Sequence, residues 1–239
     1  MLPAWLVVYR PGRASPHGSA PHTRIHTLHE RMNGIFFYIG LGAGLAAAAG
    51  LRPFLPVLLA GVLASSSALG VSFAHAPFRF LMSGWWLVIV VVTLVLAYVL
   101  QLRFQLAPII DPSDRSRRND PLAASLTGLA FGAGALLFGG TLAAHGDSAW
   151  PGLLGGLLVV GIAQRASGPI ILGARARLPD RGAREALTLY LDGVALLLAA
   201  LIALLHPLGY VLLAMLVWFL VRTRRRAGEK YAGLRILGR

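Results

Sequence analysis

The chain has 239 residues, of which 56% are hydrophobic and 13% charged. One water-soluble core cannot absorb that apolar share, so we expect lipid to cover the excess. The 22 basic and 9 acidic residues are unbalanced, and the basic ones lie between apolar stretches and at the chain ends. This is typical of loops that face an anionic membrane surface rather than nucleic acid. The sequence holds no cysteine, which excludes disulfides, thiolate metal sites and thiol nucleophiles.

Residues 1–33 are rich in proline, histidine and arginine and contain only a brief apolar run, from Trp5 to Tyr9. That run is too short for the core of a signal peptide. The irregular spacing of the histidines favours a disordered basic arm over a metal-binding tract. Met32 directly precedes the first hydrophobic region, and a further hypothesis is that the native chain begins there, so that residues 1–31 are not native.

Six apolar regions follow along the chain. A spanning helix needs roughly 20 apolar residues to cross about 30 Å of hydrocarbon. The first region (34–69) and the fourth (151–178) are interrupted by polar residues, glycine and proline. The other four are typical of plain spanning helices: residues 84–102, 122–143, 185–205 and 207–221.

Proline removes a backbone donor and clashes with the preceding turn, and glycine lowers the cost of leaving the helical conformation. The first region contains such residues around Arg52, and the fourth contains them after Arg165. We therefore expect both regions to break into two helices beside an arginine. The expected break residues are Gly50, Pro53, Pro56, Gly168 and Pro169.

A shift along the sequence superposes the two interrupted regions and pairs Arg52 with Arg165 and Gly42 with Gly155. Each interrupted region is followed by two plain ones. The sequence therefore predicts an all-α, polytopic transmembrane bundle with two internally repeated halves, each with one broken or re-entrant helix pair followed by two spanning helices. The expected divisions are a basic arm (1–33), the two halves (34–143 and 144–221) and a basic tail (222–239).

Basic residues test how often each interrupted region crosses the membrane, because cytoplasmic loops are enriched in Arg and Lys. With one net crossing each, Arg79 is the one basic residue outside, whereas two crossings also place the loop 103–118 outside. The distribution favours one crossing and a cytoplasmic tail, and two crossings is the alternative. Three crossings per half would make the halves inverted repeats, which is the plan of many secondary transporters.

Arg52 and Arg165 are the sharpest functional signals, because a charge at the bilayer centre costs at least about 2.5–3.5 kcal/mol. Beside the free N–H groups of a half-helix, a guanidinium suits a carboxylate or a phosphate. The structural alternative is that each arginine binds unpaired carbonyls or reaches an interface. Asp192, in the fifth region, is a proton-coupling site or the counter-ion of an arginine. These three residues form the expected substrate-binding site.

Glycine-rich runs, among them Gly42 and Gly155, predict close helix packing. They do not indicate a nucleotide site, since no P-loop lysine accompanies them. His75, His145 and His206 fall on the external side in the favoured topology, but they lack carboxylate or cysteine companions at metal-ligand spacing. We expect no metal, no cofactor and no catalytic residue.

Several stretches of the chain are distinctive: Gly50-Leu51-Arg52-Pro53-Phe54-Leu55-Pro56, the Arg165 region, Leu191-Asp192 and His206-Pro207. In these stretches the chain resembles the membrane family filed as domain of unknown function 4126, from about Met32 to Val221. The resemblance implies a multi-span bacterial membrane protein without an assigned activity. That family tends to place acidic residues late in the helix corresponding to 84–102, whereas this sequence has none between Met82 and Ile110. Any role of those acids is lost here or has moved to Asp192.

The leading hypothesis is a transporter or flippase in a bacterial plasma membrane, not an enzyme, for a small anionic solute or lipid headgroup. Arg52 and Arg165 would attract the anion, and Asp192 would balance charge or carry a proton. The alternative is a non-transporting membrane scaffold whose tail, 222–239, binds a partner or anionic lipid. Membrane lipid is an expected partner in both cases and nucleic acid in neither, and homo-oligomer formation stays open.

Overall fold

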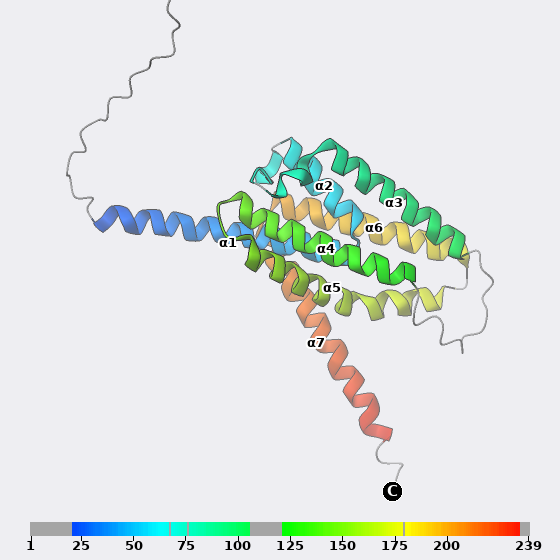
Figure 1. Ribbon diagram of the computed structural model, residues 1–239. Coiled ribbons are helices and arrows are strands. Elements are labelled where there is room, and N and C mark those ends of the chain that lie inside the picture. The colour runs from blue at the N-terminus through cyan, green and yellow to red at the C-terminus, as the bar shows by residue number, and fades with distance from the viewer. Residues whose placement is uncertain (1–20, 67, 76, 106–120, 179, 235–239) are drawn as a thin grey trace, which may run out of the picture. The chain divides into compact units, whose positions relative to one another are not determined.

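The computed structural model describes residues 21–66, 68–75, 77–105, 121–178 and 180–234, and all the regular structure in these ranges is helical (Figure 1). Helices α3 to α6 pack together around the pair α1 and α2. The elements are α1 (Pro21–Leu51), α2 (Phe54–Ser65), the short 3-10 helices η1 (Ala68–Gly70) and η2 (Phe78–Met82), α3 (Gly84–Gln105), α4 (Pro121–Ala144), α5 (Ala149–Arg177), α6 (Arg181–Leu204) and α7 (Leu208–Leu234).

Residues 1–34 and Ile35–Arg239 form separate units. In the first unit α1 already begins at Pro21, so the prediction of a disordered arm over 1–33 is wrong for residues 21–33. Proline suits the first position of a helix, where its missing N–H would have no helical partner. Each further residue then extends an existing helix at low cost. The remainder of the predicted arm, 1–20, lies outside the described residues.

Four helices in the described part of the chain are long and apolar enough to cross a membrane: Gly34–Leu51, Ala124–Ala144, Ala149–Ile171 and Gly182–Leu204. Two further apolar helices, Phe54–Ser65 and Gly84–Leu100, are shorter. Large apolar side chains such as Val92 and Leu158 lie exposed on the outside of this unit, with 59% and 69% of their surface accessible. An outer surface of this kind is compatible with a membrane protein.

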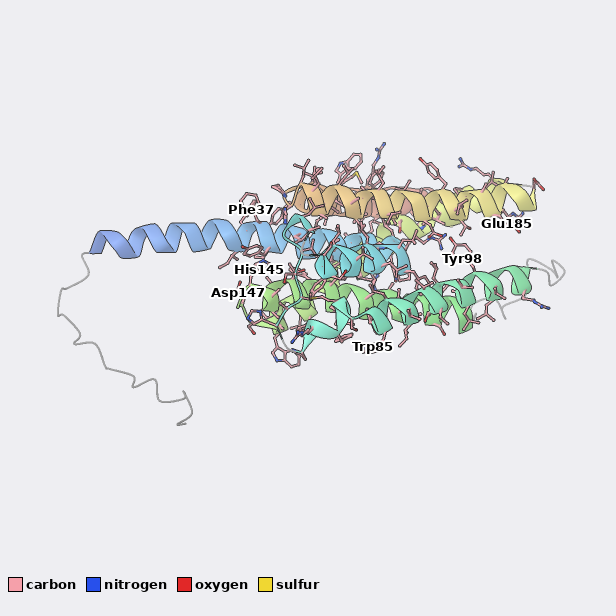
Figure 2. All side chains as sticks on the ribbon, turned by 90° about the horizontal axis from the view of Figure 1, so that it is seen from above. Phe37, Trp85, Tyr98, His145, Asp147 and Glu185 are labelled. Atoms are coloured by element: carbon pink, nitrogen blue, oxygen red, sulfur yellow. The ribbon has the colours of Figure 1, made fainter. Side chains whose placement is uncertain are left out.

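Helices α1 and α2 form an antiparallel hairpin. At the start of the hairpin, the ring of Tyr38 stacks on His145, which follows α4. At its other end, a methyl group on Gly61 would lie 2.9 Å from the carbonyl oxygen of Leu81 in η2. Both ends of the hairpin therefore lie at the end of the bundle where α4 and α6 finish. Figure 2 shows Phe37 and His145 at this end and Glu185 at the opposite one.

We call these two ends of Ile35–Arg239 the histidine end, which holds His145 and His206, and the arginine end, which holds Arg103, Arg177 and Arg184. The first interrupted region, for which one net crossing is the favoured prediction, folds as this hairpin. Its two helices begin and finish at the histidine end, because the reversal at Arg52 and Pro53 lies inside the bundle (Figure 1). Basic-residue counts did not detect this, since they register loops and not turns buried within the protein.

Helix α5 runs without interruption from Ala149 to Arg177 and contains Pro169. The prediction of a break at Gly168 and Pro169 is therefore wrong, and the second half lacks the expected broken pair. Transmembrane helices tolerate proline because neighbouring groups and local adjustments satisfy the carbonyl that loses its donor. In the same turn, the hydroxyl of Ser167 donates a hydrogen bond to the Ala163 carbonyl at 2.7 Å.

The hairpin packs closely against helices α4 and α5. Phe138 of α4 lies between two glycines of neighbouring helices, Gly42 of α1 and Gly155 of α5. A methyl group on Gly42 would collide with the Phe138 ring, and one on Gly155 would lie 2.9 Å from it. Phe73, which precedes η2, is fully buried. Side chains therefore fill the space between the hairpin, α4 and α5 around Phe138.

Candidate functional site

The reversal between α1 and α2 places Arg52 inside the bundle. Helix α1 ends at Leu51, the backbone N–H of Arg52 still donates to the Ala48 carbonyl at 3.0 Å, and Pro53 precedes α2 as its N-cap residue without a side-chain cap. Pro56 falls in the first turn of α2, where a missing N–H removes no helical hydrogen bond. The α2 N-terminus thus directs uncapped N–H groups and the positive end of its dipole toward this point.

Arg52 forms an ion pair with Asp192 of α6. Its Nε lies 3.0 Å from Asp192 Oδ1, and the two side chains are 17% and 8% exposed. Asp192 stands at the centre of α6, which runs for 24 residues from Arg181. A carboxylate this deep in an apolar helix needs a cationic partner, and the hairpin supplies one.

Tyr98 of α3 is the third member of the site. Its hydroxyl donates a hydrogen bond to Asp192 Oδ2, so each carboxylate oxygen of Asp192 has its own partner. Figure 2 shows Tyr98 on α3 directed toward α6. Arg52, Asp192 and Tyr98 therefore join three separate segments of the fold into one polar cluster, which we call the triad.

A cavity of about 340 Å³ adjoins the triad. Its other lining residues lie on the hairpin and on α3, α4 and α5. Thr127, Gln164 and Ser167 contribute hydroxyl and amide groups, and most of the remaining lining is apolar. The full lining is Gly50, Leu51, Arg52, Pro53, Phe54, Leu94, Ala97, Tyr98, Leu126, Thr127, Ala130, Gln164, Ser167, Gly168, Ile171 and Asp192.

The guanidinium of Arg52 lines the cavity as well as pairing with Asp192. It can therefore donate to an acceptor that enters this space. A guanidinium edge suits a carboxylate, sulfonate or phosphate oxygen pair.

Arg165 does not join this cluster. Its side chain is exposed on α5, and the residue before it, Gln164, lines the cavity instead. The expected pairing of Arg165 with Arg52 in one site is therefore wrong. The expectation depended on a second helix break, whereas the continuous α5 keeps the Arg165 side chain exposed, outside the helix face that lines the cavity.

Tyr98, Gln164 and Ser167 were missed by the sequence reasoning. One signal was present: Tyr98 lies late in the helix in which the resembled family tends to carry acidic residues. Its hydroxyl is a hydrogen-bond donor in an otherwise apolar stretch, and such groups find partners when buried. Gln164 and Ser167 were read as part of a helix break, so their shared face on α5 was not considered.

The histidine end holds no metal site in the described part of the chain, where no group of three metal-ligating side chains occurs. His145 instead contacts the Thr141 carbonyl through Nδ1 at 2.8 Å. His206, in the turn between α6 and α7, lies beside the Phe37 ring. Burial lowers the pKa of His206 below its usual value, and the positive charge of a protonated His145 lowers it further.

Comparison with known proteins gives no relative: no family model, no curated protein and no solved structure matches the chain. The resemblance to domain of unknown function 4126 stays a prediction.

Proposed function

We propose that this protein is a membrane transporter or flippase that binds a small anionic solute or lipid headgroup at Arg52. The observation that carries the proposal is the position of Arg52, which pairs with Asp192 and lines a cavity near the middle of the bundle. A charged side chain beside a cavity in an apolar bundle is costly, and binding of an anion there would give that cost a function.

The α2 N-terminus supports the same function. A chain that reverses inside a membrane exposes N–H groups at the start of the second helix, and secondary transporters use such helix ends to bind anionic groups. Here Pro53 and Phe54, at the start of α2, line the cavity together with Arg52. We propose that the hairpin of α1 and α2 is a re-entrant pair, and that these N–H groups and Arg52 bind the anion jointly.

The proposed orientation places the arginine end in the cytoplasm of a bacterial plasma membrane. The sequence has four basic residues in 103–118 and four in 175–184, and the described helix ends in these segments, at Arg103, Arg177 and Arg184, lie at the arginine end. At the histidine end, 66–83 contains Arg79 alone. Such a bias marks the cytoplasmic side.

Reconstituted vesicles of phosphatidylethanolamine and phosphatidylglycerol test the proposal. The solutes are labelled pyruvate, inorganic phosphate and a fluorescent short-chain phosphatidylglycerol that reports flipping. We expect Arg52→Ala to slow transport of the accepted anion by about tenfold or more, because a charge-assisted hydrogen bond is lost. Arg165→Ala, outside the cavity, is the matched control and keeps the wild-type rate. Transport of none of the three, or an unchanged rate in Arg52→Ala, contradicts the proposal.

The scaffold function is the second candidate, and one contact favours it. The guanidinium of Arg222 lies 5.0 Å above the Trp218 ring, a cation–π pair that suits a helix leaving the membrane at a headgroup surface. A scaffold requires the basic segment that follows Arg222, so deleting 225–239 abolishes its recruitment to anionic vesicles. A transporter retains its transport rate after the same deletion.

A further inference from the structure

The triad is electrically neutral when the cavity is empty, and this constrains what can bind. Arg52 contributes one positive charge and Asp192 one negative charge, at a depth where α6 is half-way along its length. A bound monoanion would leave the site with a net negative charge. An uncompensated charge in this position is disfavoured by its loss of hydration. Binding therefore requires either a second cation or a proton.

Asp192 is the group placed to take that proton. Among the described residues, the titratable or charged groups facing Asp192 are Arg52, from the hairpin, and Tyr98, from α3. The polar groups that α4 and α5 bring to the cavity, Thr127, Gln164 and Ser167, are uncharged. Arg52 stays protonated in proteins, and Tyr98 already holds its proton as a donor. A carboxylate is the remaining acceptor.

Resting on the proposed function, we infer that the solute is a small organic monoanion with an apolar body, and that it binds together with one proton, which Asp192 takes. The proton converts the Asp192 carboxylate to the neutral acid. Its former place beside Arg52 is then filled by the anionic group of the solute, so the site is neutral before and after binding. Neutrality in both states lets the loaded and the empty protein change conformation without moving net charge through the membrane.

The apolar body follows from the cavity walls. Leu94, Ala97, Ala130 and Ile171 line the space beyond the triad, and Phe54 lies at the start of α2. Transfer of apolar surface from water to such walls favours a ligand that carries a hydrocarbon group. A volume of about 340 Å³ lies at the small end of the range for ligand sites, which suits a solute better than a whole lipid.

Sulfonates provide the test, because they stay ionised over the whole working pH range and any proton taken up must enter the protein. Benzenesulfonate and methanesulfonate share one anionic group and differ in the apolar body. Calorimetric titration of the detergent-solubilised full chain, in bis-Tris and in imidazole, gives the number of protons taken up per ligand bound. We expect one proton for the wild type, and benzenesulfonate binding on the order of tenfold tighter than methanesulfonate.

Two variants test whether Asp192 is the residue that takes up the proton. Asp192→Asn is expected to bind without proton uptake, and Asp147→Asn, an exposed carboxylate at the histidine end, is expected to match the wild type. Proton uptake that persists in Asp192→Asn overturns the assignment. If Asp192→Asn fails to fold, the number of protons that the wild type takes up per ligand still tests the inference. A value of zero overturns the coupling of anion binding to proton uptake.

The outcomes separate this inference from the proposed function. Binding that depends on Arg52 but takes up no proton overturns the coupling and leaves the anion site in place. Dihexanoyl phosphatidylglycerol is the competing ligand, and if it binds more tightly than benzenesulfonate the site takes a lipid headgroup and not a solute. Binding of all three ligands that is unchanged in Arg52→Gln, or no binding of any, overturns both the inference and the proposed function.

Discussion

Arg52, at the reversal of the α1 and α2 hairpin, lies 3.0 Å from Asp192 at the centre of α6. The pair joins segments that are 140 positions apart in the sequence, and it closes the hairpin against the rest of the bundle. Most stability effects expected at the site follow from separating these two charges.

Removing one charge of the pair should lower the free energy of unfolding more than removing both charges. Arg52→Gln and Asp192→Asn each leave an uncompensated buried charge, so each is expected to lower the free energy of unfolding by about 3–5 kcal/mol. The double variant should lose less than the sum of the two. Denaturation in mixed detergent micelles measures this, with the exposed Arg165→Gln expected within about 0.5 kcal/mol of the wild type. Additive losses would contradict a direct interaction.

Tyr98→Phe removes the hydroxyl that donates to Asp192 and keeps the ring. We expect a loss of about 1.5–3 kcal/mol in the free energy of unfolding, the usual range for a hydrogen bond to a charged group. Tyr190→Phe is the matched control, because Tyr190 is 68% exposed on the same helix as Asp192. The same unfolding experiment measures both, and equal stability of the two variants would show that the Tyr98 hydroxyl does not bind the carboxylate.

Gly155→Ala places a methyl group 2.9 Å from the Phe138 ring. Overpacking of this kind is expected to cost about 1–3 kcal/mol, although alanine is the better helix former. Gly161→Ala is the control on the same helix, since its methyl group would lie 3.6 Å from the Phe131 ring, an ordinary contact. That variant should be as stable as the wild type or more so. Thermal unfolding distinguishes the two, and stabilisation of both would mean that the helices are not closely packed at Phe138.

The lowered pKa of His206 predicts a loss of stability in acid. The unfolded chain binds a proton on this residue near its ordinary pKa of about 6.5, whereas the folded protein does so only at lower pH. The free energy of unfolding therefore falls as pH drops below about 6.5, until the folded pKa is passed. His206→Gln removes this part of the pH dependence, whereas His75→Gln, at an exposed residue, retains it. A pH profile unchanged in His206→Gln would refute the prediction.

The helical class and the first break could be predicted from the sequence because their causes are local. Apolar stretches of sufficient length and the residues around Arg52 and Pro53 act within a few positions of themselves. The break at Pro169 could not be decided locally. Proline permits either outcome, and the packing of α5 against α4 and the hairpin holds it as one helix.

Only the charged residues of the site could be predicted from the sequence, because their signal is also local. Arg52 and Asp192 were identified because a charge in an apolar stretch is anomalous wherever it lies, and one of the two expected partnerships of Asp192 is the observed one. Tyr98 carries no charge, so only its contact with Asp192, 94 positions away, distinguishes it from a packing residue. Gln164 faces the cavity and Arg165 does not because of the rotation of α5, which depends on the whole fold.

The chain enters and leaves the hairpin at the histidine end. No covalent connection therefore joins the hairpin tip to the arginine end. On the other side the tip is held by the ion pair and by the contacts around it. Withdrawal by a single helical turn, about 5.4 Å, would carry Arg52 past Asp192 without stretching any loop at the arginine end. The Arg52–Asp192 ion pair is thus the contact that such a movement of the hairpin would have to break.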